Sequence, residues 1–218
     1  MSTANSEPPK TALVTGASEG IGRAFAEALA TGGYRVPLVA RHADKLRAVC
    51  DHLPGGGHQI LAADLAEPAG LARVADAVRG GGFRLLVNNA GVGTSGSFAQ
   101  TDLERLQAMT RLNCDAVVVL SHAFLQNAQR GDALINVASV LGVTGMPQTA
   151  ALYAAQQAGA QSMRWVGVGH SPRLCGAQRF SLAAATGAAY PGPVTRCHRV
   201  VTVVGPSNRP IHQRGEPP

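Results

Sequence analysis

The stretch Thr15–Gly22, which reads TGASEGIG, decides the fold of this chain. It follows a short run rich in apolar residues at 11–14 and opens a segment whose apolar residues recur at helical spacing. A strand, a glycine-rich turn and a helix N-terminus in this order form an anion site, because the unpaired N–H groups and the dipole of the helix face the turn. Glycines at 16, 20 and 22 let the backbone approach a pyrophosphate closely. We therefore expect a nucleotide site here.

Strand and helix patterns alternate over the first 163 residues. We predict strands at 11–14, 34–40, 58–63, 84–87 and 133–137, the last running to Ser139. We predict helices at 43–52, 71–78, 102–129 and 150–163, and one that opens after the glycine turn and contains Ile21, Phe25 and Leu29. Repeated units of this kind predict an α/β fold: one domain with a doubly wound parallel sheet. Pro37 disfavours a central position for the second strand. Beyond residue 163 the pattern lapses, and only 199–204 reads as a strand.

The composition, 45% hydrophobic and 15% charged, is typical of a soluble globular protein. The N-terminal residues form no apolar signal segment, and the longest apolar run, at 116–120, is too short to cross a membrane. We therefore expect a cytoplasmic protein without a membrane partner. Four scattered cysteines without a CxxC pair argue for reduced thiols and against a metal site: Cys50, Cys114, Cys175 and Cys197.

The net charge of +6 is concentrated at the C-terminus. Residues 1–163 carry 12 basic and 12 acidic side chains, whereas residues 164–218 carry seven arginines and one acid, Glu216. The arginines are spread singly with few aromatic neighbours, which argues against nucleic-acid binding. We therefore divide the chain into a nucleotide-binding core at 1–163 and a divergent, basic tail at 164–218. The tail is longer than the ordered loops that compact domains usually contain.

Two charged residues follow predicted strands and suggest which nucleotide binds. Arg41 stands after the second strand, where an acid would accept a ribose 2′-OH and an arginine pairs with a 2′-phosphate. NADP is therefore favoured over NAD, with a solvated surface arginine as the alternative. Asp64 ends the third strand. Its carboxylate suits an adenine amino group, and capping of the next helix is an equally good explanation.

Taken together, these motifs resemble the short-chain dehydrogenase/reductase family over about residues 8–163. The resemblance lies in TGASEGIG, Asp64-Leu65, NNAG at 88–91, Asn113, Ser139 and Tyr153. It implies a Rossmann-type sheet, hydride transfer between NADP and a small carbonyl or alcohol, and pairing of copies into a homo-oligomer through long helices. The cofactor contacts that it implies are Gly16, Ser18, Glu19, Gly20, Ile21, Gly22, Arg41, Asp64, Leu65, Asn89, Ala90, Gly91, Tyr153 and a late Pro191–Gly192 turn.

The resemblance also implies the catalytic set. Tyr153 would give its proton to the carbonyl oxygen, which becomes negative as the carbon accepts hydride, and Ser139 would hydrogen-bond the same oxygen. Asn113 would hold a water. The family places a lysine four residues after the tyrosine, and Gln157 occupies that position here. A cation about 5 Å away, at an effective dielectric of about 20, would stabilise the phenolate by about 3 kcal/mol.

This departure leaves alternatives open. The first is a nucleotide-binding pseudoenzyme or interaction module, in which Gln157 prevents useful turnover. The second is a truncated product with an open sheet edge, since the tail lacks the usual closing elements of the family. A shifted reading frame after about residue 163 would explain a tail rich in Arg, Gly, Pro and Ala. Sequencing the locus checks this: a continuation in another frame that resembles the family supports it, and the lack of one excludes it.

Overall fold

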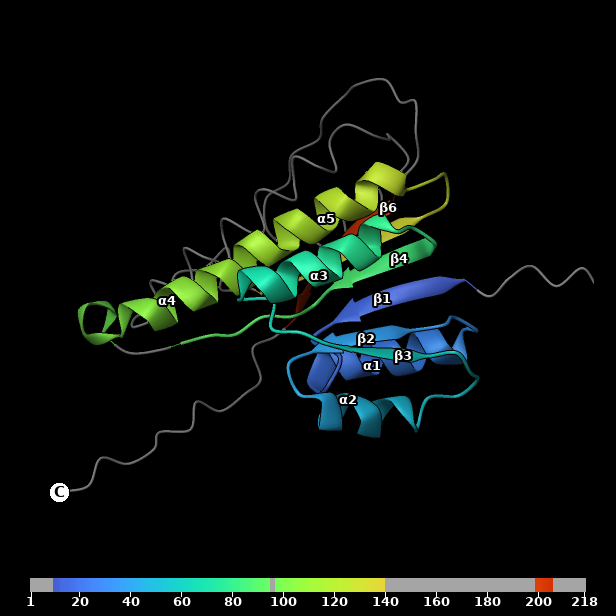
Figure 1. Ribbon diagram of the computed structural model, residues 1–218, viewed down its shortest axis with the longest axis horizontal. Coiled ribbons are helices and arrows are strands. Elements are labelled where there is room, and N and C mark those ends of the chain that lie inside the picture. The colour runs from blue at the N-terminus through green and yellow to red at the C-terminus, as the bar shows by residue number, and fades with distance from the viewer. Residues whose placement is uncertain (1–9, 95–96, 140–198, 206–218) are drawn as a thin grey trace, which may run out of the picture.

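The computed structural model describes residues 10–94, 97–139 and 199–205, in which six parallel strands form one sheet (Figure 1). The strands are β1 Thr11–Thr15, β2 Pro37–Ala40, β3 Gln59–Ala62, β4 Phe83–Asn88, β5 Ala133–Ser139 and β6 Arg199–Gly205. Their order is β3-β2-β1-β4-β5-β6, and each neighbouring pair is parallel. The predicted Rossmann-type sheet is confirmed.

Helices cover both faces of the sheet. They are α1 Gly20–Thr31, α2 Ala43–Cys50, α3 Pro68–Arg79, α4 Leu103–Thr110 and α5 Ala116–Asn127, with a 3-10 turn η1 at Phe98–Gln100. The π-helical turn η2, Arg111–Asp115, joins α4 to α5, so the helix predicted at 102–129 is one rod with an irregular middle. The α1 and α2 helices lie on one face, and α3 and α5 lie on the other (Figure 1).

The core forms two layers because side chains alternate along the strands. In β1, Leu13 packs into the layer shared with α3 and α5, whereas Ala12 and Val14 pack into the layer under α1 and α2. In β4, Leu86 belongs to the first layer and Leu85 to the second. A sheet buried on both faces explains why the strands read as nearly continuous apolar runs.

Pro37 corrects one expectation, because β2 lies between β1 and β3 rather than at an edge. The proline is the first residue of β2, where proline is tolerated within a sheet. The preceding N–H, that of Val36, donates to Nδ1 of His58 at 3.1 Å instead of to a neighbouring strand. A side chain thus supplies the hydrogen bond at the point where the strand pairing begins.

The strand predicted at 199–204 is confirmed as β6. It pairs with β5 from Ala133↔Arg199 to Ser139↔Gly205. β6 therefore covers the outer edge of β5 and is itself the last strand of the sheet in the described residues. Among the described residues, no helix has both the length and the apolar character needed to cross a bilayer.

Candidate functional site

The predicted site residues gather at the carboxyl edge of the sheet. Gly16 follows β1, Arg41 follows β2, Asp64 lies two residues beyond β3, Asn89 follows β4, and Ser139 ends β5. The chain winds outward from β1 to β3 and then returns to build β4, β5 and β6 on the other side. The strand order therefore reverses between β1 and β4, and ligands of such sheets bind in the crevice at this switch point.

The glycine turn is shaped by close backbone approaches. Gly16 and Gly20 adopt positive φ values of 65° and 57°, which favour glycine. Gly22 has ordinary helical geometry, but a Cβ atom there would lie 2.2 Å from the carbonyl oxygen of Gly16 and 2.4 Å from Nδ2 of Asn89. The first turn of α1 therefore packs directly against the turn and against the residue after β4.

The N-terminus of α1 suits an anion. Its first backbone hydrogen bond runs from Arg23 N to Glu19 O, 3.3 Å apart, so the N–H groups of residues 20–22 have no partner within the helix. The side chain of Glu19 makes no capping bond, and the first turn contains no acid. Ser18 beside it is half-buried, and Ile21 is exposed. Dipole and N–H groups together fit a pyrophosphate.

Thr15 ties the glycine turn to the segment after β4. Its side chain is 1% exposed, and its Oγ1 donates to the carbonyl of Val87 at 3.3 Å. The same oxygen accepts from the N–H groups of Asn89 and Ala90 at 2.9 and 3.0 Å. In return, Nδ2 of Asn89 donates to the carbonyls of Thr15 and Gly16 at 3.0 and 3.3 Å. These hydrogen bonds thus join the ends of β1 and β4 at the switch point.

Asp64 and Leu65, which lie in the segment after β3, have different surroundings. Leu65 is 4% exposed and packs in the core, so only its backbone faces the carboxyl edge. Asp64 does not cap α3, because the residue at that position is Glu67. Instead, Oδ1 of Asp64 accepts from the N–H of Ala66 at 2.9 Å in a tight turn. The capping explanation for Asp64 is therefore wrong.

Charged side chains of both signs surround the end of β2, with Asp44 in the first turn of α2 among them. Arg41 is exposed directly after the strand, and α2 begins two residues later. From the first turns of α2, Nζ of Lys45 reaches Oε2 of Glu19 at 3.9 Å. Both partners are more than half exposed, so the pair adds little stability. It does place a cation beside the only acid of the glycine turn.

Asn113 lies within the π-helical turn η2. Its Oδ1 accepts from the N–H of Val92 at 3.0 Å, and its Nδ2 donates to the carbonyl of Val92 at 2.8 Å. This side chain therefore holds the loop after NNAG at 88–91. One extra residue in a helix commonly marks a functional site. The water-holding role of Asn113 stays a prediction.

A family model described as short chain dehydrogenase matches residues 10–166. The chain belongs to the short-chain dehydrogenase family. It is similar to the 3-oxoacyl-(acyl-carrier-protein) reductase of Escherichia coli, with 34% identity covering 69% of this chain and 62% of that protein. It is also similar to the D-threitol dehydrogenase of Mycolicibacterium smegmatis, with 33% identity covering 67% and 59%. The chain thus spans about three-fifths of the length of these curated relatives.

Solved structures agree with this assignment. A short-chain dehydrogenase from Sphingobium yanoikuyae in complex with NADPH superposes with a TM-score of 0.68 at 31% identity, covering 73% of this chain and 65% of that chain. A short-chain dehydrogenase from Burkholderia cenocepacia in complex with NADP superposes with a TM-score of 0.62 at 30% identity, covering 68% and 63%.

Several family positions have only a partial structural account. The backbone of Ser139 ends β5 at the carboxyl edge. Tyr153, Gln157, Pro191 and Gly192 lie outside the described residues. Their roles stay predictions that rest on the family pattern.

Thr15 was not predicted as a site residue, although it begins the motif TGASEGIG. The signal for it would have been a hydroxyl at the last residue of the strand, directly before the glycine turn. Its partners lie 72 to 75 residues away in the chain, so no local pattern identifies them.

Replacing Thr15 with valine should lower the free energy of unfolding by about 2–4 kcal/mol, because the half-buried N–H groups of Asn89 and Ala90 lose their acceptor. Urea unfolding measures the change. Thr31→Val is the matched control, since the Thr31 hydroxyl bonds the Glu27 carbonyl at an exposed site. The control should change stability by less than about 0.5 kcal/mol. Equal effects of the two substitutions would contradict the role of Thr15.

Proposed function

We propose that this chain is an NADP-dependent oxidoreductase that interconverts a small carbonyl compound and an alcohol. One observation carries the proposal: the glycine turn and the N-terminus of α1, which has no side-chain cap, form a cradle for an anion, and their packing leaves no room for a Cβ atom at Gly22. That cradle lies at the switch point of the sheet, where dinucleotides bind. The family match over residues 10–166 supports the chemistry.

NADP is favoured because Arg41, rather than an acid, directly follows β2. A guanidinium binds a 2′-phosphate through charge-assisted hydrogen bonds, whereas a carboxylate there would accept from a ribose 2′-OH. Two structural relatives are described as complexes with NADPH and NADP, which supports the same choice for this chain.

When bound, the nicotinamide would supply or accept the hydride. The residues of the chain would handle the proton and the position of the substrate. Tyr153 would donate a proton to the carbonyl oxygen of the substrate, and the hydroxyl of Ser139 would donate a hydrogen bond to the same oxygen. Asn113 would support the site from η2, through its two hydrogen bonds to Val92.

The names of the relatives favour catalysis over the binding-only alternative, since those reported are a reductase and a dehydrogenase. Gln157 is the feature of this chain that separates the two functions, because it replaces a charged residue in the family pattern.

Replacing Arg41 with methionine should weaken NADPH binding by about 10- to 100-fold, because charge-assisted hydrogen bonds to a phosphate contribute about 1.5–3 kcal/mol. NADH, which lacks the 2′-phosphate, should bind the variant and the parent equally well. Titration followed by nucleotide fluorescence measures both affinities. Arg79→Met is the control, because Arg79 ends α3 and pairs with the exposed Asp76. Parent protein that binds neither nucleotide would contradict the proposed function.

A further inference from the structure

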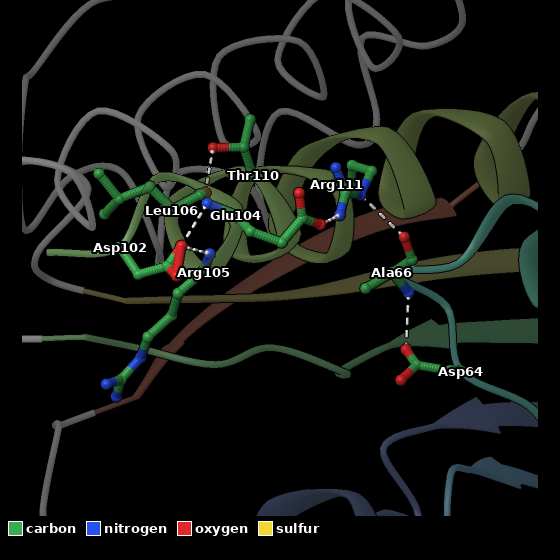
Figure 2. A network of polar contacts seen from close by, with 8 residues as sticks. All are labelled: Asp64, Ala66, Asp102, Glu104, Arg105, Leu106, Thr110 and Arg111. Carbon is green, nitrogen blue, oxygen red and sulfur yellow. Dashed lines mark hydrogen bonds and ion pairs between the residues drawn. The ribbon is translucent and has the colours of Figure 1, made fainter.

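Arg111 links two helical segments to the loop after β3 (Figure 2). Its Nε donates to the carbonyl oxygen of Ala66 at 3.0 Å, and its Nη2 pairs with Oε1 of Glu104 in α4. The Arg111 side chain is 31% exposed, whereas that of Glu104 is 71% exposed. The bond to Ala66 is therefore the better shielded of the two contacts, and it bridges 45 positions of the chain.

The loop that Arg111 reaches is the one that orients Asp64. The Ala66 residue is held on both sides: its N–H donates to Oδ1 of Asp64, and its carbonyl accepts from Arg111. Within the described residues, Oδ2 of Asp64 makes no hydrogen bond. Gly70 in α3 closes the backbone side, since a Cβ there would lie 2.0 Å from the carbonyl oxygen of Asp64. These contacts aim one carboxylate oxygen and leave it available.

The other end of the link is the π-helical turn. Arg111 is the first residue of η2, and Asn113, two residues later, holds the backbone of Val92 after β4. One irregular turn thus clamps the loop after β3 and the loop after β4. A π-helical turn is a rare geometry.

We propose that Arg111 is a positioning residue for the adenine end of the cofactor site. It acts through Ala66 on Asp64, so that Oδ2 of Asp64 accepts from the adenine amino group. Glu104 pairs with the outer side of the guanidinium and has no part in this role. The proposal rests on the proposed function, because it requires that a dinucleotide bind at the carboxyl edge.

The test compares NADPH with its deamino analogue, in which an oxygen replaces the 6-amino group of adenine. We expect the parent to bind NADPH about tenfold more tightly than the analogue, because the carboxylate loses its donor. Arg111→Met should reduce this preference to about twofold or less, as should Asp64→Ala. Glu104→Gln is the matched control. It removes the ion pair, keeps the bond from Arg111 to Ala66, and should leave the preference unchanged.

The ratio of the two affinities distinguishes positioning from general destabilisation, which weakens both ligands alike. Thermal unfolding checks that each variant is folded, and Arg111→Gln replaces Arg111→Met if the latter is unstable. A preference kept by Arg111→Met, or absent from the parent, overturns this inference while NADPH binding upholds the proposed function. Parent protein that binds neither nucleotide overturns both.

Discussion

Replacing Gly22 with alanine should abolish measurable NADPH binding. The added Cβ would lie 2.2 Å from the carbonyl oxygen of Gly16 and 2.4 Å from Nδ2 of Asn89, far inside contact distance. To relieve the clash, α1 must move away from the sheet or the Asn89 amide must leave the turn. Either movement dismantles the cradle for the pyrophosphate. Stability should fall as well, by about 1–3 kcal/mol, as in other overpacked sites.

Gly56→Ala is the matched control for this experiment. Gly56 has no positive φ, and a Cβ there would meet nothing within 4 Å. The control should therefore bind NADPH like the parent and unfold at a similar urea concentration. A Gly22→Ala protein with the nucleotide affinity of the parent would show that α1 can shift without cost, and it would refute the cradle as the binding site.

Replacing Gln157 with lysine should raise the turnover of generic carbonyl substrates by about 10²–10⁴-fold, the usual contribution of general acid–base catalysis. In the family pattern, a cation four residues after Tyr153 lies on the same helix face and stabilises the phenolate. Initial rates of NADPH oxidation at neutral pH measure the effect, with and without the substitution.

Ala155→Lys controls for the added charge. In the helix predicted at 150–163, residues two apart would not face each other, so we expect this lysine to lie on another face than Tyr153. It should leave the rate unchanged. A parent protein that already turns over rapidly, with no gain from Gln157→Lys, would refute the importance of the lost charge. Tight NADPH binding without turnover in either protein would favour the binding-only alternative.

Much of the fold could be predicted because its signals are local. The positions of β1, α1, β3, β4 and β5 follow from apolar periodicity and glycine breaks, and the structure confirms them within a few residues. Pro37 was misjudged, because whether a proline harms a sheet depends on the pairing of its own residue. Here Val36 finds His58, a partner 22 residues away, and β2 starts at the proline.

The candidate site divides in the same way. Gly16, Asn89 and Asn113 were predicted from motifs and from the family resemblance, whereas the side chain of Leu65 turned out to be buried in the core. Arg111 carried no sequence signal, because nothing near it in the chain identifies Ala66 as its partner. The break at η2 was likewise invisible, since the apolar spacing of 102–129 is continuous.

By itself, the sequence determined that a strand, a glycine turn and a helix would follow one another within a doubly wound sheet, and it predicted an anion site at that turn. These are effects of backbone freedom and side-chain periodicity over a few residues. Only the tertiary structure decided how Thr15 and Asn89 bond the two central strands together, and how Arg111 reaches the turn of Asp64. Such contacts join residues that are distant in the chain, and their geometry exists only once the sheet has assembled.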